Sequence, residues 1–298
     1  MTMQKLMSLG VVMILAVMMV AGAFQGVDAA PAKKAILVVS FGTTFAETRQ
    51  NTIEAIEKKV QQTFPDYEVR RVFTSNIVRK NLAANDNLHV DDLVTALNKL
   101  KNEGFTHVVV QSTHIIPGEE FEHKIVDTVA KYKNSFQEIV IGRPMLYFEG
   151  QNPDDYQLAV KALQQQLPKL KKGEAVVLMG HGTPEHKANA NYQAFQDKLK
   201  ANKLPVYIGT VEAAPTLEDV EEALRANKIK KVILMPFMIV AGDHANNDMA
   251  GDESDSWKSI LTEKGYKVEV YLTGLGANPA VQDIYVQHVK DAIAGMKL

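Results

Sequence analysis

The chain has 298 residues, of which 46% are hydrophobic and 23% are charged, and this balance is typical of a soluble globular protein. Its net charge is −2, so nothing indicates the basic face of a nucleic-acid-binding protein. Because there is no cysteine, disulfides, thiolate zinc sites, iron–sulfur clusters and covalent c-type haem are excluded, and any metal must be held by nitrogen and oxygen ligands.

The first residues predict a secretory signal. Lys5 precedes an apolar run over residues 6–24, and small residues follow at Val27 and Ala29, the −3 and −1 positions of a signal cleaved after Ala29. An uncleaved membrane anchor is the alternative, because the apolar run is long for a signal. We expect a cleaved signal peptide at residues 1–29 and a mature protein that is periplasmic or otherwise exported, without stable membrane insertion.

After this segment, short apolar runs alternate with amphipathic helical patterns. The expected strands cover residues 35–40, 68–73, 107–112, 138–141, 175–179, 206–210, 231–235 and 267–272. The expected helices cover residues 48–63, 90–102, 121–132, 156–170, 189–201, 217–226, 254–263 and 279–296. Continuous apolar strands separated by helices indicate α/β architecture, with parallel sheets covered on both faces.

The length exceeds what one hydrophobic core usually serves, so we expect two α/β domains. The lysine-rich segment 169–173 marks their boundary, which gives an N-terminal domain over residues 30–173 and a C-terminal domain over residues 174–298. The final helix, residues 279–296, can cross back onto the N-terminal domain.

The two halves of the chain resemble each other in sequence. Residues 35–43, AILVVSFGT, align with residues 175–183, AVVLMGHGT, and residues 107–120 align with residues 231–244. In the second alignment the last position pairs Glu120 with His244. We therefore predict an internal pseudo-repeat of two similar lobes with a cleft between them.

Three residues at strand ends are the candidate catalytic and metal-binding residues. His181 follows the strand at 175–179, while Glu120 and His244 follow the third strand of each half. Ligands of parallel sheets bind beyond the carboxyl ends of the strands, so facing lobes bring these side chains into one cleft.

Two imidazoles and a carboxylate suit a divalent transition metal ion, and they leave coordination positions open for handing the ion on. A neutral histidine can also take protons near neutral pH. Taken singly, each residue has a plainer interpretation: His181 as a packed turn residue, His244 as a solvated residue at a helix start, and Glu120 as a partner of a helix dipole.

Several other polar residues are weaker candidates. His123 lies on the helical face of Glu120 and is either an accessory metal or haem ligand or an exposed surface residue. His288 is expected at the surface, and Arg143 is one of several dispersed cations that could meet substrate carboxylates.

At these positions the chain resembles the class II chelatases, and most closely the anaerobic sirohydrochlorin cobaltochelatase family. The resemblance covers the chain from about residue 33 to its end. The segments that carry it are 37–45 (LVVSFGTTF), 72–77 (VFTSNI), 114–121 (HIIPGEEF), 180–183 (GHGT), 209–212 (GTVE) and 235–251 (MPFMIVAGDHANNDMAG).

The resemblance implies two flavodoxin-like, Rossmann-like lobes with a tetrapyrrole in the cleft. It implies ATP-independent insertion of Co²⁺ into sirohydrochlorin, with Fe²⁺ and Ni²⁺ as alternatives, and the chain has no Gly-Lys-Ser/Thr phosphate loop. It makes metal ligands of His181, His244 and Glu120, with histidine accepting the pyrrole protons. A family habit of self-association is compatible with a homo-oligomer.

The matching segments also place five residues at the expected tetrapyrrole cleft: Ser40, Phe41, Thr43, Ser75 and Glu212. Export departs from the family pattern, because corrin synthesis is expected in the cytoplasm. Two alternative functions therefore stay open. One is an exported protein that binds or transports a metal or a tetrapyrrole, and the other is a phosphohydrolase that uses the histidine of Gly-His-Gly.

Overall fold

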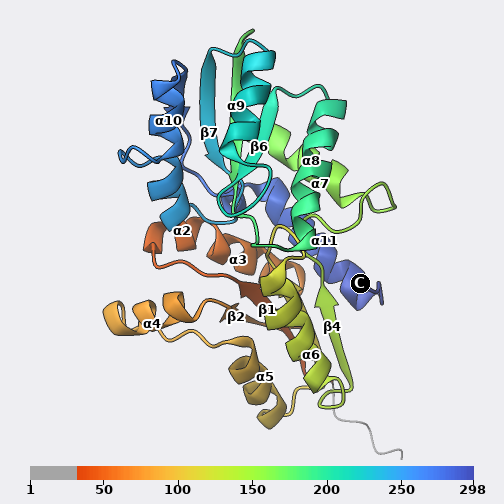
Figure 1. Ribbon diagram of the computed structural model, residues 1–298. Helices are drawn as coiled ribbons and strands as arrows, with labels where there is room; N and C mark the ends of the chain where they lie inside the picture. Colours follow the sequence, from red (N-terminus) through yellow and green to blue (C-terminus); the bar gives the residue numbers. More distant parts are fainter. Residues whose placement is uncertain (1–31) are drawn as a thin grey trace, which may run out of the picture. The chain divides into compact units, whose positions relative to one another are not determined.

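Two four-stranded sheets, each with all strands parallel, form the framework of the protein (Figure 1). The first has the order β2-β1-β3-β4 and contains β1 (Lys34–Ser40), β2 (Glu68–Phe73), β3 (His107–Ser112) and β4 (Glu138–Gly142). The second has the order β6-β5-β7-β8 and contains β5 (Glu174–Gly180), β6 (Val206–Thr210), β7 (Lys231–Pro236) and β8 (Lys267–Val270). The identical strand order confirms the predicted two-lobed α/β fold and its pseudo-repeat.

The computed structural model describes residues 32–298, so the expected signal peptide lies outside the described residues. The helices of the first half are α2 (Ala46–Asn51), α3 (Ile53–Thr63), α4 (Asn76–Asn85), α5 (Leu93–Asn102), the π-helix η1 (Glu120–Val126), α6 (Asp127–Tyr132) and α7 (Asp155–Gln164). Those of the second half are η2 (Lys187–Asn189), α8 (Ala190–Ala201), α9 (Leu217–Ala226), the π-helix η3 (Ala245–Met249), α10 (Trp257–Glu263), η4 (Leu275–Ala277) and α11 (Pro279–Ile293).

Two of the differences from the predicted helices arise from local hydrogen bonds. The helix expected over residues 48–63 is broken at Thr52, whose hydroxyl donates a hydrogen bond back to the carbonyl of Thr48. Helix α4 was not predicted, although Ser75 begins it by accepting a hydrogen bond from the backbone N–H of Val78. In both cases a local side-chain hydrogen bond sets a helix end, which hydrophobic periodicity does not detect.

The apolar core has three layers because strand residues alternate between the two faces of each sheet. Ile36 and Val38 of β1 face a layer that also holds Val176 and Leu178 of β5, so one apolar core is common to both sheets. The outer face of the first sheet packs against α5, η1 and α6, and that of the second sheet packs against α9, η3 and α10. The shared layer therefore holds the two lobes together.

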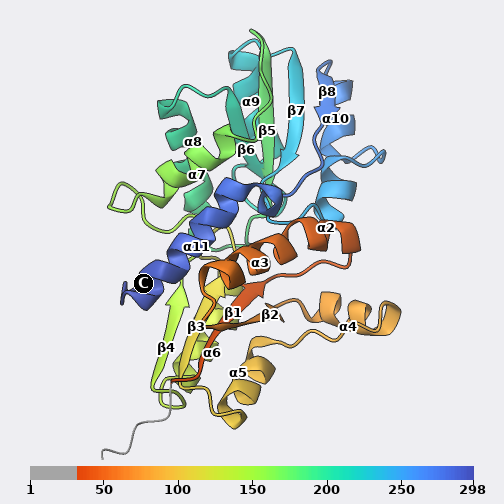
Figure 2. The same cartoon turned by 180° about the vertical axis from the view of Figure 1, so that it is seen from behind.

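Helix α11 packs on the N-terminal lobe although it is the last element of the chain (Figure 2). It lies against α3, β3, β4 and α7, and the apolar side chains of Val281, Tyr285 and Val289 are buried in the shared layer. The hydroxyl of Tyr285 donates a hydrogen bond to the carbonyl of Thr113, directly after β3. Among the described residues, no helix is both long enough and apolar enough to cross a membrane.

A buried ionic network lies where α11 meets β4 and α7, and it corrects two expectations. Arg143 is buried, with Nε and Nη2 donating to the two carboxylate oxygens of Asp155 at 2.8 and 2.9 Å, so it is not available for a substrate carboxylate. His288 is fully buried rather than on the surface, and its ring nitrogens lie 3.0 Å from the carbonyl of Arg143 and 3.3 Å from Asp155.

Asp155 is the residue on which this network depends. Burial alone would raise its pKa, but the hydrogen bonds from His288 and Arg143 outweigh burial and hold the pKa below its usual value. A carboxyl group with a lowered folded-state pKa stabilises the fold above its unfolded pKa, and this stabilisation is lost as the pH falls through the folded-state pKa.

We predict that Asp155→Ala lowers the free energy of unfolding by about 3–5 kcal/mol at neutral pH, because it removes the bidentate partner of a buried guanidinium, whose remaining carboxylate contact among residues 32–298 is Asp291. Denaturant unfolding followed by circular dichroism measures the change. Asp283→Ala is the matched control, since it removes an exposed ion pair between α11 and Lys59 and should cost less than about 1 kcal/mol. Equal losses in the two variants would contradict the prediction.

Candidate functional site

Loops from both lobes surround a cavity of about 640 Å³, a volume within the range of small-molecule and cofactor sites. The loops follow β1, β2 and β3 in one lobe and β5, β6 and β7 in the other, so they lie at the carboxyl ends of the strands. Every predicted site residue lines this cavity: Ser40, Phe41, Thr43, Ser75, Glu120, His123, His181, Glu212 and His244. The parallel sheets thus bring together residues that are far apart in the sequence.

The loops of the two lobes contact each other reciprocally. A Cβ atom added at Gly118 would lie 3.3 Å from Thr183, and one added at Gly242 would lie 3.9 Å from Thr43. The Gly-Thr turn after the first strand of each lobe therefore faces the glycine after the third strand of the other lobe. Gly182, at φ +83°, adopts a conformation that favours glycine, which accounts for its place in Gly-His-Gly-Thr.

His181, Glu212 and His244 form a group that could hold a metal ion. Each offers one ligand atom, and these three atoms lie within 4.8 Å of one another. The two imidazole rings meet edge to face with their centroids 4.6 Å apart. Their side chains are 39%, 38% and 36% exposed, so the group is open to the cavity and accessible to an incoming ion.

Glu212 owes its position to the pairing of β5 with β6. The backbone N–H of Glu212 donates to the carbonyl of His181 at 3.0 Å, which continues the strand register past the ends of both strands. Its Oε2 then lies 3.4 Å from Nδ1 of His181. The sequence prediction put Glu212 at the cleft, but it did not identify this residue as the acidic neighbour of the two histidines.

Hydrogen bonds to the Nδ1 atoms determine which nitrogen of each histidine is free. Nδ1 of His181 donates to the carbonyl of Gly182 at 2.9 Å, and Nδ1 of His244 donates to the Asp248 carboxylate at 2.6 Å. Because a carbonyl and a carboxylate only accept, the lone pair of each ring lies on Nε2. Metal-binding histidines are commonly oriented in this way by a second hydrogen-bonded partner.

Glu120 lines the same cavity but lies outside the group of three. It begins the π-helix η1, and its Oε2 is buried without a hydrogen-bond partner among residues 32–298. A second π-helix, η3, directly follows His244 at the equivalent place in the other lobe. π-Helices are rare and are often found at functional sites, and here one begins at Glu120 and the other begins directly after His244. The role of Glu120 as a metal ligand stays a prediction.

His123 lies at the edge of the cavity and its side chain is 62% exposed. A hydrogen bond to Asp127 raises its pKa, and Nδ1 lies 2.9 Å from that carboxylate. Within the described chain it joins no cluster of three metal-binding side chains, so its role as an accessory metal or haem ligand stays a prediction.

Large apolar side chains are exposed at the cavity. Phe41 is 46% exposed with its ring centroid 6.5 Å from that of His181, and Ile77 is 72% exposed. Ile239 and Val240 line the wall that the second lobe provides. Exposed apolar side chains that border a concave site often mark ligand binding.

The charged residues of the cavity are mostly acidic. Glu119, Glu120, Glu212 and Asp243 line it, whereas Lys124 is the lysine among the lining residues. A concave surface with an excess of one charge raises the local concentration of counter-ions. The cavity therefore favours the approach of a cation.

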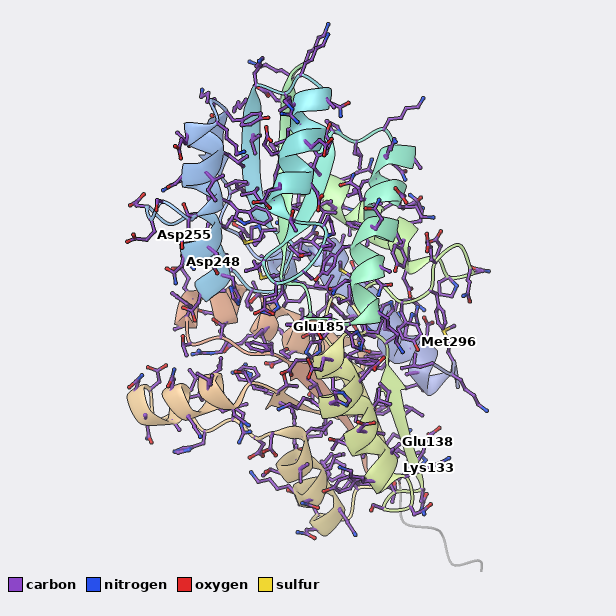
Figure 3. All side chains as sticks on the ribbon, viewed as in Figure 1. Lys133, Glu138, Glu185, Asp248, Asp255 and Met296 are labelled. Carbon is purple, nitrogen blue, oxygen red and sulfur yellow. The ribbon has the colours of Figure 1, made fainter. Side chains whose placement is uncertain are left out.

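One ion-pair cluster joins the two lobes beside the cavity. The Glu122 carboxylate in η1 lies 3.2 Å from Nε2 of His186 and 3.3 Å from Nζ of Lys187. The hydrogen bond with His186 lowers the pKa of Glu122. Glu185, the neighbour of His186, is labelled in Figure 3 where the α8 side of one lobe approaches the α6 side of the other.

Comparison with known proteins agrees with this geometry. Residues 34–294 match the family described as cobalt chelatase (CbiK). The chain is 40% identical over 261 residues to the sirohydrochlorin cobaltochelatase of Salmonella typhimurium. The aligned region covers 88% of this chain and 97% of that protein. It is 36% identical over 266 residues to the sirohydrochlorin cobaltochelatase CbiKC of Nitratidesulfovibrio vulgaris. Here the aligned region covers 89% of this chain and 92% of that protein.

Solved structures share the fold at lower sequence identity. SirB from Bacillus subtilis with Fe³⁺ superposes with a TM-score of 0.62 at 16% identity, over 88% of this chain and 96% of that chain. The sirohydrochlorin chelatase SirB from Bacillus subtilis subspecies spizizenii in complex with cobalt superposes with a TM-score of 0.59 at the same identity and coverage. These two superpositions support the two-lobed fold.

We predict that Asp248→Ala weakens the binding of a divalent transition metal ion by about 10–100-fold, because the ring of His244 loses the partner that orients it. Calorimetric titration of the protein with Zn²⁺ measures the change. Asp252→Ala is the control, since Asp252 is a nearby exposed carboxylate paired with Lys258. Unchanged affinity in Asp248→Ala would show that this hydrogen bond does not support metal binding.

Proposed function

Because the chain belongs to the cobalt chelatase (CbiK) family, we propose that it inserts Co²⁺ into the tetrapyrrole sirohydrochlorin without ATP. The observation that carries this proposal is the convergence of His181, Glu212 and His244 at one edge of the interlobe cavity. The family identifies the chain as a chelatase, and this group supplies nitrogen and oxygen donors beside a space for the second substrate.

The donor set suits an ion that is handed on rather than stored. The Nε2 atoms of the two imidazoles carry free lone pairs, and the carboxylate adds one negative charge. Three protein ligands leave further coordination positions open, as in catalytic metal sites. The pyrrole nitrogens of a macrocycle can enter these positions while the protein ligands leave. Nitrogen and oxygen donors also accept Fe²⁺ and Ni²⁺, so these ions are the alternatives to Co²⁺.

The third ligand in this proposal is Glu212. The sequence prediction assigned that place to Glu120, but Glu212 has its carboxylate within 4.8 Å of both histidine donor atoms and Glu120 does not belong to that group. The apolar surface formed by Phe41 and Ile77 would pack against the macrocycle, and Ser40, Thr43 and Ser75 would border it.

We predict that the wild-type protein converts many equivalents of sirohydrochlorin and Co²⁺ in a timed absorbance assay. His181→Ala and His244→Ala should each lower kcat/KM by at least about 100-fold, because loss of a direct ligand costs more than loss of a supporting hydrogen bond. His89→Ala, an exposed histidine outside the cavity, is the control. Stoichiometric binding without turnover by the wild type would instead favour a carrier protein.

We also propose that the mature protein is exported, on the basis of the basic start and apolar run at residues 5–24. Cleavage after Ala29 makes Ala30 the first residue of the mature chain. Intact-mass analysis of the protein from the periplasmic fraction of its native cells tests this prediction. A full-length mass in the cytoplasmic fraction would contradict it.

A further inference from the structure

Two buried polar atoms in residues that line the cavity have no hydrogen-bond partner among the described residues: Nε2 of His114 and Oε2 of Glu120. Unpaired buried polar atoms are costly, and in a binding site they mark positions that a ligand satisfies. Both belong to the loop that follows β3 and continues into η1. The proposed metal ligands do not include either residue.

The tautomer of His114 follows from its contact with Ser112. The buried Ser112 hydroxyl accepts from the backbone N–H of His114 at 3.2 Å and lies 2.9 Å from its Nδ1. We assign the ring proton to Nε2, because this tautomer lets the buried hydroxyl donate to Nδ1 and the hydroxyl has no other acceptor within residues 32–298. Burial lowers the pKa of His114 to about 4, although the negative charge of Glu120 acts to raise it. His114 therefore holds a neutral N–H donor in the loop that lines the cavity.

Metal insertion requires proton acceptors, and the metal ligands cannot supply them while they still hold the ion. Exchange of a divalent ion for two pyrrole protons breaks two N–H bonds, and each nitrogen keeps its electron pair and bonds to the ion. Nε2 of His181 and of His244 cannot accept these protons while their lone pairs bind the metal, and their Nδ1 atoms already carry protons. A base outside the group of three is therefore needed for any proton that leaves the macrocycle before the histidines release the ion.

We propose that Glu120 accepts the pyrrole protons, one at a time, and that His114 is a positioning residue whose Nε2–H holds the Glu120 carboxylate in place when the macrocycle fills the cavity. This inference rests on the proposed chelatase function. Each proton forms an O–H bond on Glu120 and then passes to water at the cavity mouth, so two protons leave for each ion inserted.

The neutral state of His114 matters for this division of roles. A charged imidazolium beside Glu120 would form an ion pair and make the carboxylate a weaker base. A neutral N–H donor orients the carboxylate without neutralising its charge. Burial, which disfavours the charged ring, therefore preserves the ability of Glu120 to accept protons.

The first test is Glu120→Gln, which keeps the shape of the side chain and removes the base. We expect Co²⁺ affinity, measured by calorimetry without tetrapyrrole, to stay within about threefold of wild type, whereas kcat for insertion falls by about 10²–10⁴-fold. Glu212→Gln should instead lose Co²⁺ affinity. The exposed Glu149→Gln is the control for both measurements.

Two outcomes would overturn the assignment of Glu120. Equal loss of Co²⁺ affinity in Glu120→Gln and Glu212→Gln would make Glu120 a metal ligand, and an unchanged kcat in Glu120→Gln would remove it from the reaction. Both outcomes can be interpreted only if the wild-type protein turns over. If the wild type shows no turnover, the chelatase function itself is rejected. Recovery of the Glu120→Ala rate by added formate, without a change in Co²⁺ affinity, would support a proton acceptor.

The second test compares His114→Gln, which keeps an N–H donor, with His114→Phe, which removes it. For His114→Phe we expect kcat to fall by about tenfold, the equivalent of one lost hydrogen bond, with little change in KM or in Co²⁺ affinity. His114→Gln should recover most of the rate. Equal rates in these two variants, with both folded by circular dichroism, would show that the donor has no role.

Discussion

The site depends on one constraint, which is that all strands of both sheets are parallel. Parallel strands end at the same edge of a sheet, so each lobe presents the loops after its first, second and third strands together. The apolar layer shared by the two sheets holds these edges facing each other, and the contacts Gly118–Thr183 and Gly242–Thr43 bring the loops to close range. Residues from opposite halves of the chain therefore line one cavity.

Most of the fold could be predicted from the sequence because the determining signals are local and repeated. Continuous apolar runs identified the strands, and the similarity of the halves identified the two lobes. The contact between His181 and Glu212 could not be predicted in this way, because it arises from the backbone pairing of two loops separated by a helix. The π-helices η1 and η3 were also beyond prediction, since hydrophobic periodicity does not distinguish them from short α-helices.

The buried ionic network shows a second limit of sequence analysis. Arg143, Asp155 and His288 are polar, and residues of these types are usually exposed, but all three are buried here. Their burial is tolerated because Asp155 pairs with the guanidinium of Arg143 and with the ring of His288, while Asp291 and the backbone carbonyl of Arg143 supply further partners. Burial of this kind is a property of the assembled network, so inspection of the three residues one by one assigns them to the surface.

The position of α11 has a consequence for the order of folding. The N-terminal lobe lacks part of its core until Tyr285 and Val289 arrive from the end of the chain. Contacts between residues so distant in sequence form late and slow the folding of a chain. The lobe made first by the ribosome therefore completes its core only after the last helix of the chain has been synthesised.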